Sequence, residues 1–135
     1  MASYTKFQPF VAAIANKVHN LGSDQLTIAL TNTVPTATMA VLADLTQISY
    51  TNLSSRNITT TSSTQTSGTY SLILNDLTLT ASGAVATFRY VVIYNSTAAS
   101  GNLIGWYDYG SAVTMANGDT FLIDFDGTNG LLQIV

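Results

Sequence analysis

The chain has 135 residues and a mass of 14.3 kDa, the size of one domain that can bury a core without disulfides or metal ions. It contains no cysteine, which excludes a disulfide framework, iron–sulfur and cysteine–zinc sites, and thiol catalysis. Only 8% of the residues are charged, with four basic side chains against seven acidic ones and a formal net charge of −3. Four basic side chains cannot line a groove that follows a phosphate backbone, so we expect no nucleic-acid partner.

The uncharged surface must be carried mainly by threonine, serine and asparagine, and threonine alone occupies 21 positions. Such a surface is typical of proteins that pack against copies of themselves or of another protein. No segment has the ~18 consecutive apolar residues of a membrane span, so we expect no membrane partner. The stretch Phe7–Val18 is polar in places and ends without a small-residue cleavage site, so we expect no signal peptide and synthesis in a cytoplasm. The glycosylation sequons at Asn52, Asn57 and Asn95 are then chance products of the composition.

One segment near the N-terminus has helical periodicity. Its apolar residues share one helical face: Phe7, Phe10, Val11, Ile14 and Val18. Pro9 lies in the first turn, Thr5 is a candidate N-cap, and Gly22 is a candidate left-handed C-terminal cap. The pattern predicts a helix over about residues 6–20 that packs against the rest of the domain.

After this segment the apolar period changes to two, which predicts strands. The expected strands are Leu26–Thr31 (half-buried), Ile58–Thr61, Tyr70–Leu74, Leu77–Leu79, Val85–Tyr94, Leu103–Tyr109, Phe121–Phe125 and Leu131–Ile134. A short helical turn is expected at Met39–Ala43, and the polar stretch Asn52–Gly68 is expected to be a long exposed loop or a flat polar edge. We therefore predict one mainly β domain over residues 1–135, a compact antiparallel β-sandwich or barrel of about seven short strands with an N-terminal helix.

Catalytic residues are not indicated. His19 is the single histidine and has no nucleophile or second histidine in any recognisable pattern, so we interpret it as a capping or packing residue. Asp124 and Asp126 share one face of a strand and point outward if Phe125 points inward, which is the geometry of a glycosidase pair. A tight turn explains the same residues without further assumptions, so we expect no enzyme activity and no catalytic or cofactor-binding residues.

The segment Asp124–Gly130 is similar in composition to a calcium-binding loop, because it combines hard oxygen ligands with glycines. It lacks a third acidic ligand and the downstream glutamate of a helix–loop–helix site. We therefore predict no metal site.

Aromatic residues at a strand can form a platform for a sugar. Tyr107 and Tyr109 alternate with Trp106 and Asp108, so the two tyrosines share a face, with Asp108 and Asn102 as nearby polar groups. The competing interpretation, which we favour, is that these rings fill the core or an oligomer interface.

Five segments of the sequence resemble small proteins encoded among the head genes of tailed bacteriophages and prophages. They are Lys17–Gly22, Ala29–Thr33 with Pro35, Phe88–Asn95, Leu103–Gly110 and Asp124–Gly127. The resemblance runs in order over nearly the whole chain and is least evident over Thr51–Gly68. No catalytic or ligand-binding residues belong to that group's pattern, so none are transferred.

The resemblance implies a virion structural protein, best described as a capsid decoration (cement) protein that binds and stabilises the major capsid shell. Its expected partners are the major capsid protein of the same phage and itself, with a trimer favoured, and its expected location is the capsid surface after synthesis in the bacterial cytoplasm. The alternatives are a tail or head–tail junction (neck) protein and a carbohydrate-binding module on the virion surface. The expected contact regions are the N-terminal segment to Lys6, Asn52–Gly68 and Thr97–Asn102.

Overall fold

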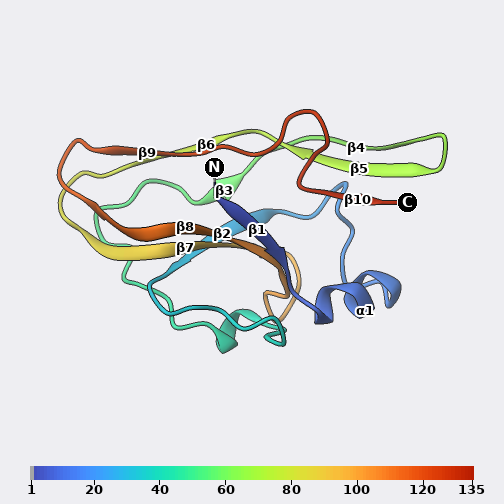
Figure 1. The fold of residues 1–135 in the computed structure, drawn as a ribbon, viewed down its shortest axis with the longest axis horizontal. Coiled ribbons are helices and arrows are strands. Elements are labelled where there is room, and N and C mark those ends of the chain that lie inside the picture. Colours follow the sequence, from blue (N-terminus) through green and yellow to red (C-terminus); the bar gives the residue numbers. More distant parts are fainter. Residues whose placement is uncertain (1) are drawn as a thin grey trace.

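The computed structural model describes residues 2–135, and within them the fold is mainly antiparallel β-sheet with one short helix near the N-terminus (Figure 1). The elements are β1 (Ser3–Lys6), α1 (Pro9–Ala15), β2 (Leu26–Thr31), a 3₁₀ turn (Leu42–Asp44), β3 (Asn57–Ile58), β4 (Thr60–Thr66), β5 (Thr69–Leu74), β6 (Leu77–Thr80), β7 (Val85–Asn95), β8 (Leu103–Met115), β9 (Thr120–Ile123) and β10 (Leu132–Ile134). The predicted fold class is confirmed. The described strands number ten rather than about seven, because residues 3–6 form an additional strand and the strand expected at 58–61 is divided between β3 and β4.

The strands form two layers (Figure 1). One layer is a five-stranded sheet with the order β1-β8-β7-β2-β3. The other contains a three-stranded sheet, β10-β5-β4, and a two-stranded sheet, β6-β9. All of these pairings are antiparallel, so the arrangement is that of a β-sandwich.

The core lies between the two layers. Tyr107 on β8 is opposite Val91 on β7, which is opposite Leu30 on β2, so these residues share one face of the five-stranded sheet. The Tyr107 ring lies 6.1 Å from the ring of Phe125, which belongs to the other layer. Apolar residues of that layer are also buried here: Leu72, Leu74, Leu79 and Ile123.

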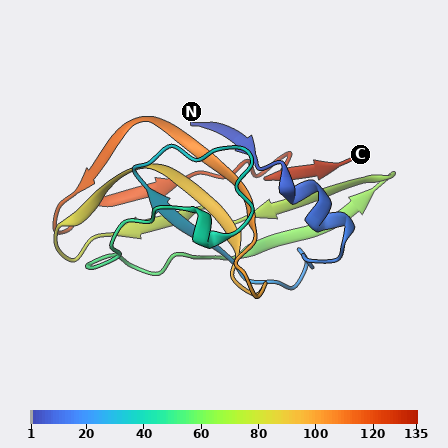
Figure 2. The same ribbon diagram turned by 90° about the horizontal axis from the view of Figure 1, so that it is seen from below.

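The opposite face of the five-stranded sheet is also covered. Trp106 on this face packs against Phe7, with ring centroids 4.5 Å apart. The long connection from β2 to β3 crosses the sheet, as Figure 2 shows in cyan to green, and Leu45 on it is buried. All six residues of β2, Leu26–Thr31, are therefore buried, and the expectation that this strand is half-buried was wrong. The two-residue period of β2 could not reveal that its second face is covered, because the segment that covers this face has no regular structure.

The helix is shorter than predicted: α1 has seven residues, Pro9–Ala15, whereas the prediction was a helix from about residue 6 to residue 20. Residues 3–6 form β1, and Thr5 pairs with Trp106 instead of capping the helix. The N-cap residue is Gln8, which makes no side-chain capping hydrogen bond. Lys17, with φ of 64°, follows the helix, whereas Gly22 has no left-handed conformation.

The predicted apolar face of the helix is only partly present. Phe7 and Phe10 are buried, but Val11 is 56% exposed and Val18 is 38% exposed. Phe7 precedes the helix, and its position is set by the end of β1 rather than by helical periodicity. The predicted helical face therefore combined residues from the connection before the helix, from the helix itself and from the loop after it.

The polar stretch Asn52–Gly68 is largely strand: it contains β3 and β4, and the predicted flat polar edge is the better description. β4 forms a hairpin with β5 that turns at Ser67 and Gly68, both with positive φ. This hairpin reaches one end of the molecule in Figure 1. The predicted helical turn at Met39–Ala43 corresponds to the 3₁₀ turn, a few residues later in the chain.

Gly105 on β8 lies directly beneath the side chain of Tyr4, and a methyl group there would overlap the Tyr4 hydroxyl and ring. We expect Gly105→Ala to displace β1 and to lower the free energy of unfolding by about 1–3 kcal/mol. The measurement is the urea midpoint, and in a Tyr4→Ala background the cost of the same change should largely disappear. Gly127→Ala is the matched control, because no atom lies within 4 Å of a methyl group at that position. Equal stability of the two alanine variants would contradict the assigned contact.

Candidate functional site

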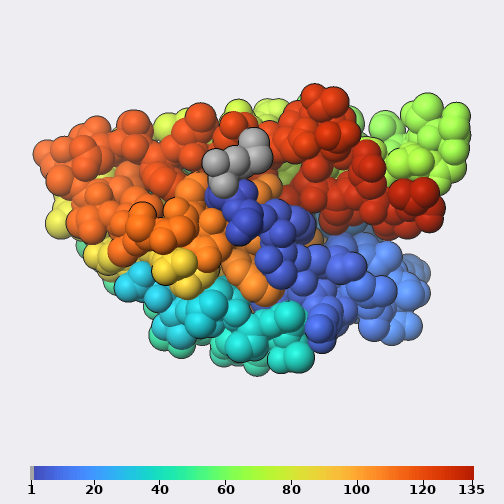
Figure 3. Space-filling model, in the orientation of Figure 1, coloured from blue at the N-terminus to red at the C-terminus, as the bar shows by residue number. Residues whose placement is uncertain are grey.

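A cleft of about 700 Å³ lies where β1 and β8 meet the segment that follows β9. We call it the tyrosine–aspartate cleft, after the side chains that line it from the two layers: Tyr4, Tyr107, Tyr109, Asp124 and Asp126. Figure 3 shows the N-terminal segment in blue beside the C-terminal segment in red on this side of the molecule. The cleft therefore joins residues that are far apart in the sequence.

The three tyrosines form a continuous row of rings. The ring centroids of Tyr4 and Tyr107 are 5.2 Å apart, and those of Tyr107 and Tyr109 are 6.4 Å apart, with tilted planes in both pairs. Tyr107 and Tyr109 lie on the same face of β8, as the alternation predicted, and Tyr4 is opposite Tyr107 across the strand pair. The rings thus form one wall of the cleft.

The Tyr107 and Tyr109 hydroxyls remain protonated at neutral pH. Burial raises the pKa of both phenols to about 12; Tyr109, Asp126 and Asp124 add to the effect at Tyr107, and Asp124 adds to it at Tyr109. Within residues 2–135 neither hydroxyl makes a hydrogen bond. Both are therefore available as donors.

The two carboxylates of the cleft have different roles. Asp124 and Asp126 are exposed while Phe125 between them is buried, as the alternation predicted. Asp126 accepts hydrogen bonds from the backbone N–H groups of Thr128 and Asn129, at 2.8 and 2.9 Å, and from the Asn129 side chain at 3.1 Å. These bonds hold the pKa of Asp126 below its usual value. Asp126 is thus a turn-forming residue.

Asp124 accepts no hydrogen bond from residues 2–135, in contrast to the other six aspartates. Each of those six accepts at least one: Asp24, Asp44, Asp76, Asp108, Asp119 and Asp126. No group of three or more histidine, cysteine or acidic side chains that could hold a metal ion occurs in the described part of the chain.

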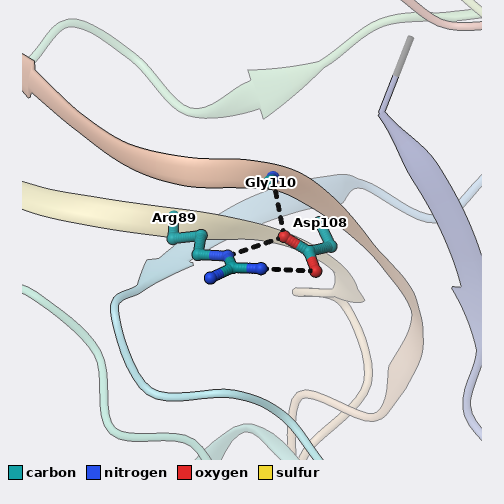
Figure 4. Close-up of polar contacts among 3 residues, drawn as sticks. All are labelled: Arg89, Asp108 and Gly110. Carbon is teal, nitrogen blue, oxygen red and sulfur yellow. Dashed lines mark hydrogen bonds and ion pairs between the residues drawn. The ribbon is translucent and has the colours of Figure 1, made fainter.

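The polar neighbours expected for the tyrosines lie elsewhere. Asp108 is on β8 between Tyr107 and Tyr109 but points to the other face, where it forms an ion pair with Arg89 on β7 (Figure 4). Asn102 is before the start of β8 and forms an isolated bridge with Val41. The sequence hypothesis was correct about the shared face of the tyrosines and wrong about these two polar partners.

The ion pair is a structural contact between neighbouring strands. Arg89 donates from Nε to one Asp108 oxygen at 2.8 Å and from a terminal nitrogen to the other at 3.1 Å, and the Gly110 N–H donates to the same carboxylate at 2.8 Å. The hydrogen bonds from Arg89 and then Gly110 keep the pKa of Asp108 below its usual value. Gly110 has φ of 82°, a left-handed conformation, beside this pair. Asp108 is therefore engaged within the sheet.

His19 is buried in a small polar cluster beside the end of α1. Its Nδ1 accepts a hydrogen bond from Asn95 Nδ2 at 3.0 Å, and the same amide group donates to Asp24 at 2.6 Å. Its ring lies 5.2 Å from that of Phe10, and its Nε2 is buried without a hydrogen-bond partner. These are the contacts of a packing residue. Burial lowers the pKa of His19, and Asp24 opposes this shift.

No family model, curated protein or solved structure matches the chain. Among residues 2–135, no helix is both long and apolar enough to cross a membrane.

The buried His19 predicts a pH-dependent stability. Because its pKa in the folded state is below the unfolded value, the unfolded chain binds more protons as the pH falls, and stability that is present above about pH 6.5 is lost progressively as the pH falls below that value. We expect His19→Phe to remove this part of the dependence while retaining the contact with Phe10 and eliminating the unpartnered Nε2. The measurement is the urea midpoint at several pH values. An identical slope for both proteins across this range would contradict the prediction.

Proposed function

We propose that the chain is a structural protein of a tailed-phage virion, a decoration protein that binds the shell formed by the major capsid protein of the same phage. The support comes from the segments that resemble phage head proteins, together with the surface chemistry of the β4–β5 hairpin. Binding to the assembled shell and not to its dissociated parts would stabilise the shell by mass action. Many weak contacts on one particle would add through avidity.

The observation that carries the proposal is the outer edge of β4. This strand has seven residues, pairs with β5 on one side, and pairs with no described strand on the other. Proteins usually protect such edges with charged residues, proline or a bulge. Thr60–Thr66 contains no charge and no proline, and the one register shift, between Thr60 and Ser62, leaves residues 62–66 in regular pairing with no bulge. The edge is therefore suited to pairing with a neighbouring chain.

The side chains of the hairpin suit the same role. Thr64, Gln65, Thr66 and Ser67 are exposed, and their hydroxyl and amide groups both donate and accept hydrogen bonds. An uncharged polar contact loses less on desolvation than one that buries unpaired charges. The hairpin is thus the part of Asn52–Gly68 where we expect a partner to bind.

The N-terminal segment to Lys6 is a poorer test of shell binding than the sequence indicated. It is the edge strand β1, and the chain that follows it places Phe7 against Trp106. Deleting it would remove a strand from the sheet and uncover Tyr107. A loss of binding in such a deletion would then report damage to the fold.

The direct test introduces a charge at the tip of the hairpin. We expect Thr66→Lys to reduce co-sedimentation with shells assembled from the major capsid protein by at least about tenfold, because a buried unpaired charge costs more than ~1.4 kcal/mol at an interface. Thr78→Lys is the matched control, since Thr78 is exposed on β6, away from the hairpin. Circular dichroism should be unchanged in both variants. Equal binding of both variants would exclude the hairpin as the contact, and no binding by the wild-type chain would exclude the decoration function.

The native mass in solution separates the virion alternatives. We expect light scattering on a sizing column to give a trimer, three times 14.3 kDa, as suits a protein on a threefold axis of the shell. A ring of six or more copies would favour the tail or neck. A monomer at every concentration would contradict the favoured trimer and would leave assembly on the shell as the only route to self-contact.

A further inference from the structure

We infer that the tyrosine–aspartate cleft binds a neutral saccharide. This inference does not depend on shell binding, because the cleft and the hairpin edge are built from different residues. It also differs from the sugar platform that the sequence left as the less favoured alternative, since its polar groups come from the segment after β9 and not from Asp108 or Asn102.

The apolar wall of the cleft fits the C–H face of a sugar ring. Tyr109 is partly exposed, Tyr107 contacts it at 6.4 Å between centroids, and Leu122 is 53% exposed at the rim. Small-molecule sites typically combine such aromatic walls with a few convergent polar groups. The row of rings supplies the first of these components.

The polar groups of the cleft fit the hydroxyls of a sugar. Within residues 2–135, Asp124 is an acceptor without a hydrogen-bond partner, and the phenols of Tyr107 and Tyr109 are donors without one. A sugar hydroxyl both donates and accepts, so it can bridge a carboxylate and a phenol. Among the seven aspartates, the one that accepts no hydrogen bond from residues 2–135 lines the same cleft as these two tyrosines, and this juxtaposition carries the inference.

The charge of the cleft selects the class of saccharide. Its lining includes two carboxylates and no lysine or arginine. A sugar with carboxylate, sulfate or phosphate groups would place like charges within a few ångströms, which is unfavourable. A divalent cation fits less well, because Asp126 already accepts three hydrogen bonds from its own turn. A neutral glycan is the ligand that matches both the donors and the charge.

The test is an NMR titration of the wild-type chain with four neutral probes: maltohexaose, cellohexaose, laminarihexaose and chitohexaose. We expect at least one to shift the ring signals of Tyr107 and Tyr109, while those of Tyr50 and Tyr70, outside the cleft, stay in place. An alginate hexasaccharide, which is anionic, should leave all four unchanged. Trp106 fluorescence is not a suitable readout, because that ring packs on Phe7 at the other face of the sheet.

Two conservative variants test the assigned groups. We expect Asp124→Asn and Tyr109→Phe each to weaken binding of the active probe by about tenfold or more, since each alters one hydrogen-bonding group and preserves shape. Asp119→Asn removes the same charge from the turn before β9, outside the cleft, and should bind like the wild type.

Three results would overturn the inference: no ring shift with any neutral hexasaccharide, unchanged affinity in both cleft variants, or shifts produced equally by Ca²⁺ alone. Ring shifts that depend on protein concentration without sugar would instead assign the cleft to a second copy of the chain. A failure of shell binding leaves all of these readouts unaffected, so the two proposals fail independently.

Discussion

β7 and β8 are the two longest strands, of 11 and 13 residues, and each pairs on its other side with a further strand of the same sheet. Their antiparallel register places Trp106 opposite Val92 and Tyr107 opposite Val91. Consecutive residues of β8 therefore point to opposite layers: the indole supports Phe7 and the N-terminal segment, and the phenol faces the second sheet. The rest of the structure depends on this pairing, because β1, the cover over β2 and the tyrosine row all take their positions from it.

The local alternation of apolar and polar residues was sufficient to predict a strand's bounds where the neighbouring segments are also strands. The alternation in Leu26–Thr31 predicted β2 with its observed bounds, and Val85–Tyr94 predicted β7 to within one residue. The same alternation failed to predict conformation or burial where these depend on an irregular segment or on a strand far away in the sequence. Residues 3–6 are extended because β8 lies beside them, and no local feature distinguishes them from the start of a helix. Thr31 is likewise buried beside the long connection from β2 to β3, which has no regular period, and its hydroxyl donates to the Thr46 carbonyl there.

The candidate site was predictable in its parts and not in its assembly. Period-two alternation placed Tyr107 and Tyr109 on one face and turned Asp124 outward, and both predictions are confirmed. That these two faces border the same cleft follows from the packing of one layer on the other, for which one sequence has no signal. Proximity in sequence made Asp108 an attractive partner, but Arg89 on the next strand takes its carboxylate. Tyr4 enters the site only through the pairing of β1.

The position of β1 has a consequence for how the chain reaches its native state. Ser3 pairs with Asp108, so β1 must wait for a partner that is synthesised 105 residues later (108 − 3). Closing so long a loop is entropically costly and slows folding, which classes this edge with the late, non-local events. Until β8 has been made, the N-terminal segment has no strand to pair with, and Phe7 remains without its cover from Trp106. Until that point in synthesis the nascent chain therefore carries β1 unpaired and the Phe7 ring exposed.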